Sequence, residues 1–275
     1  MRVQYCRVGP SVGAQVVMRF SRVLRVVLAV LGVTAAATIG SAGLVVWYYG
    51  RNLPDYRMIT EYRSPAGRPF VSVGAMPPQL IDAFLSAEDR DFYSHPGIDL
   101  PSIARAVLID ALQFGSNRRP IGASTITQQV VRMFLLSNEQ TIARKVKEAL
   151  LALRIERVLS KDRILELYLN EVYLGCGSRG VVQAANNYFA KSIQGLSLAE
   201  VALLAGLPRA PTHYDPWRFP EAAKNRRDWV IDRMVEDGFV SPSQANAAKA
   251  LPISTGVRPG PQGCSGRSPS ISSSQ

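Results

Sequence analysis

The stretch KDRILELYLN at residues 161–170 places its apolar side chains one, three and four positions apart, at Ile164, Leu165, Tyr168 and Leu169. Positions with this spacing share one face of an α-helix, so the stretch predicts an amphipathic helix packed on a core. Two further segments show the same periodicity, one just before Glu88 and one around Glu148. Their apolar positions are Leu80, Phe84 and Ala87 in the first segment and Ile142, Val146, Ala149, Leu150 and Leu153 in the second.

Capping patterns and loop signals extend this helical pattern over the body. Ser197-Leu-Ala-Glu200 is a capping-box pattern that opens an apolar run, and Ser241-Pro-Ser-Gln244 repeats it with proline at the first helical position. Strand signals are few, and glycine and proline cluster at 65–78, 115–122 and 208–220, as expected for loops between helices. We therefore expect an all-α body.

The composition narrows the class of function. The chain has 275 residues, 47% hydrophobic and 19% charged, with a formal net charge of +11. Much of that charge lies at the ends of the chain, so the body is only mildly basic, which disfavours a nucleic-acid partner. Cys6, Cys176 and Cys264 match no CxxC spacing and there are only two histidines, so a disulfide scaffold, a zinc finger and a multi-histidine metal site are not supported.

An uncharged apolar segment at residues 26–49 predicts a transmembrane anchor, because a helix of this length can cross a bilayer. The arginines of residues 1–25 favour a cytoplasmic N-terminus, and Trp47, Tyr48 and Tyr49 suit the far interface. The body is then expected outside the cytoplasm. The alternative is a cleaved signal peptide, for which the small residues at 35–37 would offer a cleavage site.

The other end of the chain differs from the body as well. Residues 252–275 are rich in serine, glycine and proline and poor in apolar side chains. Such a composition cannot build a core, so we expect a disordered tail there. The body at 50–251 is then the one folded domain outside the membrane.

Three segments of the body carry polar side chains suited to catalysis or ligand binding. EDRDFYSHPG at 88–97 begins with a carboxylate beside aromatic residues, which could act as a general base or be a solvated helix end. GASTITQQ at 122–129 could hold a phosphate or a sugar hydroxyl, or simply cap a helix. RKVKE at 144–148 could form a cationic site for a pyrophosphate beside Glu148, or a surface ion pair.

Taken in order, these segments resemble the motifs of the peptidoglycan glycosyltransferases. KDRILELYLN at 161–170 and GVVQAANNYFAKS at 180–192 supply the fourth and fifth motifs. These enzymes occur as monofunctional proteins and as the N-terminal module of bifunctional penicillin-binding proteins. The resemblance runs from about residue 55 to about residue 251.

The resemblance implies a lysozyme-like helical lobe, a smaller membrane-proximal lobe and a cleft between them. It also implies that the chain polymerises lipid II at the bacterial plasma membrane, with the nascent glycan strand as donor and moenomycin as inhibitor. Glu88 would be the general base that deprotonates the acceptor's 4-hydroxyl. Glu148 would be the second catalytic glutamate, in the donor site. The reaction inverts the anomeric carbon, makes a β-1,4 link and releases undecaprenyl pyrophosphate.

The resemblance also implies a set of substrate-binding residues. They are Asp89, Arg90, Ser124, Thr125, Gln128, Gln129, Arg132, Arg144 and Lys145. No metal ligand is assigned and no cofactor is required, although a divalent cation, Mg²⁺ or Mn²⁺, could assist at the pyrophosphate. The chain departs from the usual motifs at Arg132, Met133 and Ala190, where the family has lysine, asparagine and glycine.

Other functions remain as alternatives. A lytic enzyme that cleaves glycan and a catalytically inactive scaffold of a cell-wall complex would both suit parts of the pattern, and proteins of such a complex are candidate partners in any case. No Ser-x-x-Lys or Lys-Thr-Gly element of a transpeptidase occurs in this sequence. A monofunctional polymerase and a truncated bifunctional protein therefore both fit.

Overall fold

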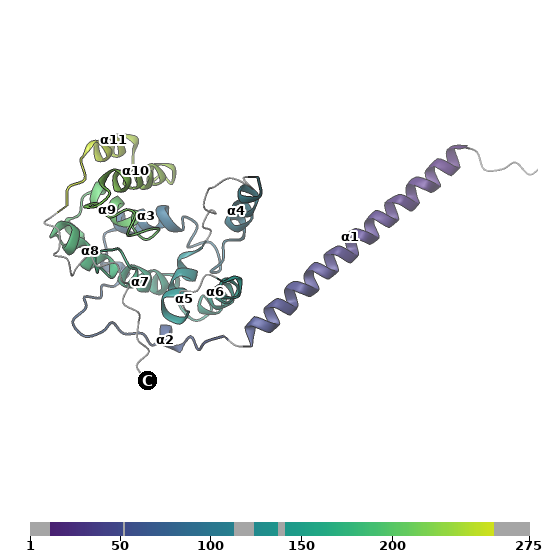
Figure 1. The fold of residues 1–275 in the computed structure, drawn as a ribbon, viewed down its shortest axis with the longest axis horizontal. Helices are drawn as coiled ribbons and strands as arrows, with labels where there is room; N and C mark the ends of the chain where they lie inside the picture. Colours follow the sequence, from purple (N-terminus) through teal and green to yellow (C-terminus); the bar gives the residue numbers. More distant parts are fainter. Residues whose placement is uncertain (1–11, 52, 113–123, 137–140, 256–275) are drawn as a thin grey trace, which may run out of the picture. The chain divides into compact units, whose positions relative to one another are not determined.

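The computed structural model describes residues 12–51, 53–112, 124–136 and 141–255. Figure 1 shows that these residues are mostly helical. Within the described ranges no strand occurs, and one isolated antiparallel bridge joins Tyr173 to Arg179. The expected all-α fold is thus confirmed. The elements are α1 Val12–Gly50, α2 Arg57–Thr60, η1 Val73–Ala75, α3 Pro78–Glu88, α4 Leu100–Leu112, α5 Ile126–Leu135, α6 Ile142–Ile155, α7 Lys161–Glu171, α8 Gly180–Phe189, η2 Ile193–Gly195, α9 Leu198–Gly206, α10 Pro220–Glu236 and α11 Pro242–Ala250.

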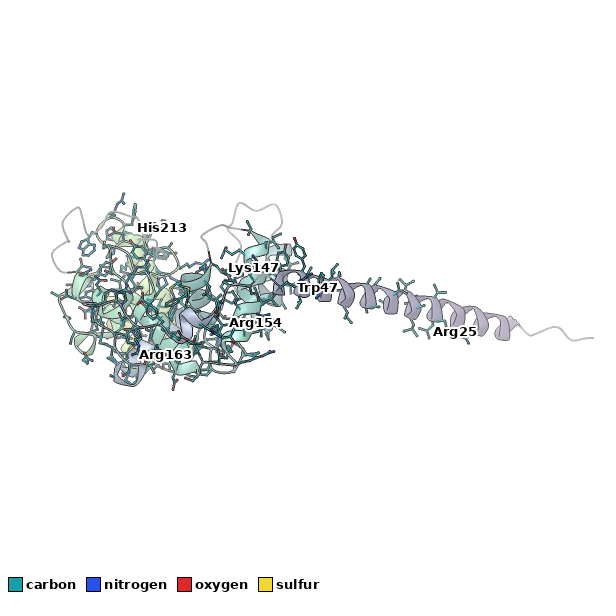
Figure 2. The ribbon with its side chains drawn as sticks, turned by 90° about the horizontal axis from the view of Figure 1, so that it is seen from below. Arg25, Trp47, Lys147, Arg154, Arg163 and His213 are labelled. Carbon is teal, nitrogen blue, oxygen red and sulfur yellow. The ribbon has the colours of Figure 1, made fainter. Side chains whose placement is uncertain are left out.

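The chain divides by its contacts into two units, Met1–Asn52 and Leu53–Gln275. In the first unit, the described part of α1 contains one stretch, Leu24–Gly50, that is long and apolar enough to cross a membrane. Figure 2 shows Arg25 towards one end of this stretch and Trp47 towards the other. The stretch fits the predicted anchor at 26–49, and a signal sequence would have the same properties. The predicted tail at 252–275 lies almost wholly outside the described residues, and the division of the body into two lobes stays a prediction.

The core of the second unit is built around α7. Ile164, Leu165, Tyr168 and Leu169 are all fully buried, as their spacing predicts. α7 contacts α5, α8 and η1, while α9 packs on both α3 and α10. Figure 1 shows these two groups of helices, and α11 lies beside α10. The segments predicted to bear the site are therefore carried by helices that share one core.

Side chains satisfy backbone groups at the starts of α9 and α11 and beside α7. Both predicted capping boxes form, at Ser197 with Glu200 and at Ser241 with Gln244. The amide of Asn170 donates to Val71 O and its oxygen accepts from Val71 N, at 2.8 and 2.9 Å. These contacts satisfy backbone groups that a loop would otherwise leave unpaired.

The helix predicted around Glu148 is present as α6, but the prediction of which face it buries is wrong. Ile142 is 85% exposed, and Val146, Ala149, Leu150 and Leu153 are only half-buried. The face that packs inwards carries Glu148, Leu151, Ala152 and Ile155. Apolar residues occur on both sides of this helix, and the buried side was missed because it includes a carboxylate that two neighbouring cations neutralise.

Cys176 is disulfide-bonded, which the spacing of the cysteines did not predict. The two other cysteines, Cys6 and Cys264, lie outside the described residues. Cys176 also has a positive φ of 45°, in the turn between α7 and α8. The cysteine thus occupies a backbone conformation that few side chains adopt.

Ala190 ends α8 in the left-handed conformation, with φ 54° and ψ 37°. This geometry explains why glycine is usual at this position in the motif, because an L side chain is strained there. We expect Ala190→Gly to raise the free energy of unfolding by about 1 kcal/mol, the strain relieved being larger than the added chain entropy.

Thermal unfolding of the full chain in detergent measures this change. Ala247→Gly is the matched control, because Ala247 is an exposed interior residue of α11 and the same substitution should lower stability by about 1 kcal/mol there. Destabilisation by both substitutions would contradict the interpretation of Ala190.

Candidate active site

Glu88 is the last residue of α3, and the chain turns away at Asp89, where φ is −163°. The inward face of the helix, with Leu80 and Phe84, is fully buried and fixes the direction of the helix end. The Glu88 side chain is 12% exposed. It lines an open pocket together with Arg90, Ser124, Trp229 and other residues. A carboxylate so placed can meet a ligand while it remains largely shielded from water.

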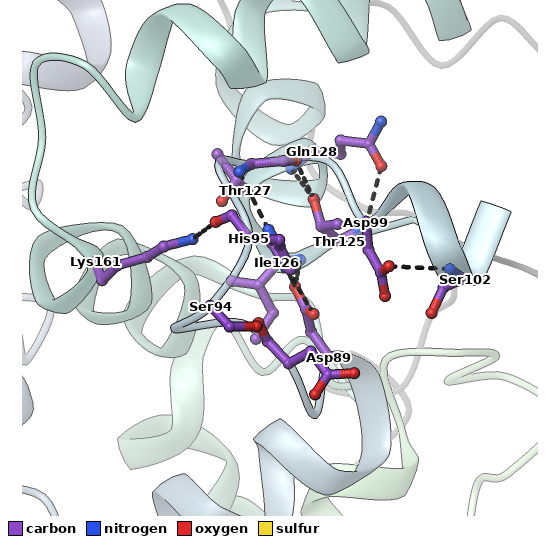
Figure 3. A network of polar contacts seen from close by, with 12 residues as sticks. Asp89, Ser94, His95, Asp99, Ser102, Thr125, Ile126, Thr127, Gln128 and Lys161 are labelled. Atoms are coloured by element: carbon purple, nitrogen blue, oxygen red, sulfur yellow. Dashed lines mark hydrogen bonds and ion pairs between the residues drawn. The ribbon is translucent and has the colours of Figure 1, made fainter.

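The neighbouring carboxylate, Asp89, is buried and links His95 to the start of α5, as Figure 3 shows. It accepts hydrogen bonds from His95 Nε2 at 2.9 Å and from Ile126 N at 2.8 Å. The second bond satisfies a free amide at the start of α5 and suits the positive end of that helix. Asp89 thereby fixes the end of α3 to α5. Its predicted contact with substrate stays a prediction.

Thr125 and Gln128 form a capping box at the start of α5, so the helix-cap interpretation of this segment applies to both residues. Gln128 N donates to Thr125 Oγ1 at 3.2 Å, and Thr125 N donates to Gln128 Oε1 at 3.0 Å. Thr125 Oγ1 also donates to Gly97 O at 2.7 Å. Both side chains are buried, so in this structure they serve the fold, and their substrate-binding role stays a prediction.

Gln129 and three arginines surround Glu88. Gln129 Nε2 donates to Glu88 Oε2 at 2.8 Å, and Arg226 Nη2 lies 3.8 Å from Glu88 Oε1. Burial raises the pKa of Glu88 above its ordinary value, while the Gln129 hydrogen bond and the charges of Arg226, Arg209 and Arg132 oppose this rise. The carboxylate is therefore a stronger base than an exposed glutamate and yet has cations that favour its ionised form.

Glu148, the second predicted catalytic glutamate, is fully buried on α6. Its carboxylate pairs with Arg144 one turn earlier and with Lys145, whose Nζ lies 2.9 Å from Oε2. Lys145 Nζ also donates to Ser124 Oγ at 2.5 Å, and Ser124 lines the Glu88 pocket. Lys145 therefore connects the RKVKE segment to that pocket, and its side chain remains 45% exposed.

Arg90 pairs with a carboxylate that lies outside the three predicted site segments. Its guanidinium lies 3.1 Å from Asp237 Oδ1, just after α10. The arginine side chain is half-exposed and lines the pocket, whereas the aspartate is nearly buried. The ion pair can thus orient Arg90 while leaving its remaining donors available to a ligand.

Sequence reasoning missed Arg209, Arg226 and Trp229. Arg209 follows α9, and the other two residues lie on α10, more than 120 positions after Glu88 in the sequence. No local motif marks them, because they reach the site through the packing of α3, α9 and α10. The only signal available was the basic character of the segment NRRDW at 225–229.

The described ion-pair partners of Glu88 and Glu148 are cationic side chains and not further metal ligands. Among the described residues, no three histidine, cysteine, aspartate or glutamate side chains gather in a metal-binding group. Glu88 and Glu148 are both engaged by cationic side chains, which would repel a metal ion. Assistance by a divalent cation, Mg²⁺ or Mn²⁺, stays a prediction.

Comparison with known proteins identifies the family to which the chain belongs. A model of the family described as Transglycosylase matches residues 55–235. Penicillin-binding protein 1A of Rickettsia conorii is 44% identical over 232 residues, covering 78% of this chain and 29% of that protein. Its counterpart in Aquifex aeolicus is 39% identical over 247 residues, covering 83% and 34%.

The chain thus spans about a third of the length of these relatives. A crystal structure of penicillin-binding protein 1A from Haemophilus influenzae matches 69% of this chain and 18% of that one, at 26% identity and a TM-score of 0.42. The matched residues 55–235 include Glu88, Glu148 and the arginines and lysine described around them. The chain belongs to the transglycosylase family.

Proposed function

We propose that this chain is a peptidoglycan glycosyltransferase that extends glycan strands from lipid II and releases undecaprenyl pyrophosphate. The observation that carries the proposal is Glu88, a largely shielded carboxylate in an open pocket, held by Gln129 and surrounded by arginines. Family membership supports the reaction class, since the matched region includes both glutamates.

In the proposed mechanism, Glu88 removes the proton from the 4-hydroxyl of the acceptor's N-acetylglucosamine. Burial raises the pKa of the Glu88 carboxyl, which makes the carboxylate more basic, and the neighbouring arginines favour the ionised form that the reaction needs. The hydrogen bond from Gln129 to Oε2 holds the carboxylate in one orientation. The acceptor oxygen then attacks the donor's anomeric carbon from the face opposite the leaving group, which gives the inverted β-1,4 link.

The leaving pyrophosphate builds up negative charge, so cations around it lower the barrier. Lys145 suits this task because it is half-exposed and lies next to Ser124 at the pocket. Glu148 and Arg144 would hold Lys145 in place, while Arg132 would add charge from α5. A lytic enzyme would have no pyrophosphate to hold, so this set of cations favours the polymerase over that alternative.

The membrane segment fits this substrate. Lipid II is held in a bilayer by its undecaprenyl chain, so we propose that α1 anchors the enzyme in the plasma membrane with the catalytic domain outside the cytoplasm. A reporter fused after Gln275 should be active only outside the cytoplasm, with the full-length chain in the membrane fraction. A soluble product that begins near Thr38 would instead indicate a cleaved signal peptide.

Incubating the full chain in detergent with labelled lipid II tests the activity directly, and a polymer that lysozyme digests is the expected product. Glu88→Gln should lower turnover by at least about 100-fold, because the amide keeps the shape of the side chain but cannot accept the proton. The variant should keep the unfolding temperature of the wild type to within a few degrees. Residual activity above about one percent would argue against Glu88 as the base.

The cationic residues have a separate test. Lys145→Ala and Arg132→Ala should each lower turnover at least about tenfold, because a charge-assisted contact to the departing pyrophosphate is worth about 1.5 to 3 kcal/mol. Both should also weaken moenomycin binding, if this phosphoglycolipid uses the same cations. Lys147→Ala on the same helix is the matched control and should change neither quantity. Unchanged turnover and unchanged inhibitor affinity in both variants would overturn the assignment of Lys145 and Arg132 to the pyrophosphate.

A further inference from the structure

Arg226 of α10 lies between Glu88 and an aromatic ring. Its guanidinium approaches Glu88 Oε1 to 3.8 Å, and its Cζ lies 4.0 Å from the ring centroid of Trp229. Its Nε donates a hydrogen bond to Gly206 O at the end of α9, at 3.2 Å. The arginine side chain is only 10% exposed. It is therefore held from three sides, with its charge directed at the carboxylate.

The packing of α9 on α10 leaves just enough room for this arginine. A Cβ added to Gly206 would lie 2.9 Å from Arg226 Cγ, closer than ordinary atoms approach. The absence of a side chain at Gly206 thus lets the arginine stem pass along α9 towards Glu88. The position of the Arg226 side chain therefore depends on α9 as well as on α10, the helix that carries it.

Charge balance makes Arg226 and Glu88 dependent on each other. Burial disfavours the charged form of Arg226 and lowers its pKa, and the Glu88 carboxylate opposes that effect. Conversely, a shielded carboxylate loses solvation and needs a nearby positive charge to stay ionised. Arg226 is the cation with a described ion pair to Glu88.

We infer that Arg226 is a positioning residue that keeps the Glu88 carboxylate ionised and directed into the pocket. The inference rests on the proposed function, because it assigns Glu88 the role of base. It goes beyond that proposal in naming the residue that sets the working pH range of the base. Trp229 holds the guanidinium of Arg226 against its ring, and Gly206 leaves room for the aliphatic part of the Arg226 side chain.

Other groups also face Glu88 and limit the size of the effect. Gln129 and Arg132 come from α5, Arg209 follows α9, and the buried hydroxyl of Tyr168 comes from α7. Arg132 and Arg209 would remain after Arg226 is replaced. Because an opposite charge at this distance shifts a carboxyl pKa by about one unit or more, we expect a partial shift and not a complete loss of the base.

The test is the dependence of turnover on pH for the full chain in detergent with lipid II. Arg226→Gln should move the acidic limb of turnover about one pH unit higher, because Glu88 without its cation needs a higher pH to ionise, and most turnover should return at high pH. Arg226→Lys keeps the charge and should restore the limb towards the wild-type position. Lys224→Gln, which removes a partly exposed cation that pairs with Asp228 on the same helix, is the control and should leave the profile unchanged.

Two results would overturn the inference. One is an acidic limb of Arg226→Gln that coincides with the wild type while turnover falls equally at every pH, as a structural role predicts. The other is a limb of Arg226→Lys displaced as far as that of Arg226→Gln. If Arg226→Gln does not fold, Gly206→Ala takes its place, since the added methyl group should displace the arginine and move the limb in the same direction.

A measurement without substrate separates this inference from the proposed function. The Glu88 carboxyl can be titrated in the full chain by infrared spectroscopy, with Glu88→Gln identifying its band. Its pKa should be higher in Arg226→Gln than in the wild type, whether or not lipid II is polymerised. A polymerase whose Glu88 titrates at the same pH in both chains would overturn only the inference about Arg226.

Discussion

The arrangement of the site depends on one internal interaction, the acceptance of two hydrogen bonds by the Asp89 carboxylate. The donors come from His95 and from the first turn of α5, so one side chain joins the end of α3 to the start of another helix. Glu88 precedes Asp89 directly, and Gln129 lies on the first turn of α5. The separation of the Glu88 carboxylate and the Gln129 amide, which are hydrogen-bonded at 2.8 Å, is thereby fixed by this junction. Thr125, bonded to Gly97, closes the same junction from the other side.

The second constraint is that a buried carboxylate needs a cation beside it, and both Glu88 and Glu148 have one. Glu148 is fully buried with Arg144 and Lys145 beside it, and Glu88 is nearly buried with Arg226 as its ion-pair partner. Removing a carboxylate from water is costly unless a cation accompanies it. Each carboxylate therefore requires a precise arrangement of basic side chains, and these same side chains suit a substrate that carries phosphate.

The sequence predicted the local features of this site better than the tertiary ones. The buried residues of α7, the two capping boxes and the pairing of Arg144 with Glu148 follow from spacings of three and four along a helix. The inward face of α6 was missed, because periodicity locates apolar side chains but does not say which side of a helix a partner covers. Arg226 and Arg209 were missed for a related reason, since they approach Glu88 only when α9 and α10 pack on α3.

α6 carries apolar side chains on its outer side as well as on its inner side, and this affects how the protein can be handled. Its inner side packs on the core through Leu151, Ala152 and Ile155, while Ile142 is almost wholly exposed and other apolar side chains on the outer side are half-exposed. Leu108 and Leu112 of α4 are exposed as well. Water is a poor solvent for such surfaces. A version of the protein without α1 should therefore still self-associate in plain buffer and become monodisperse only when detergent covers these side chains.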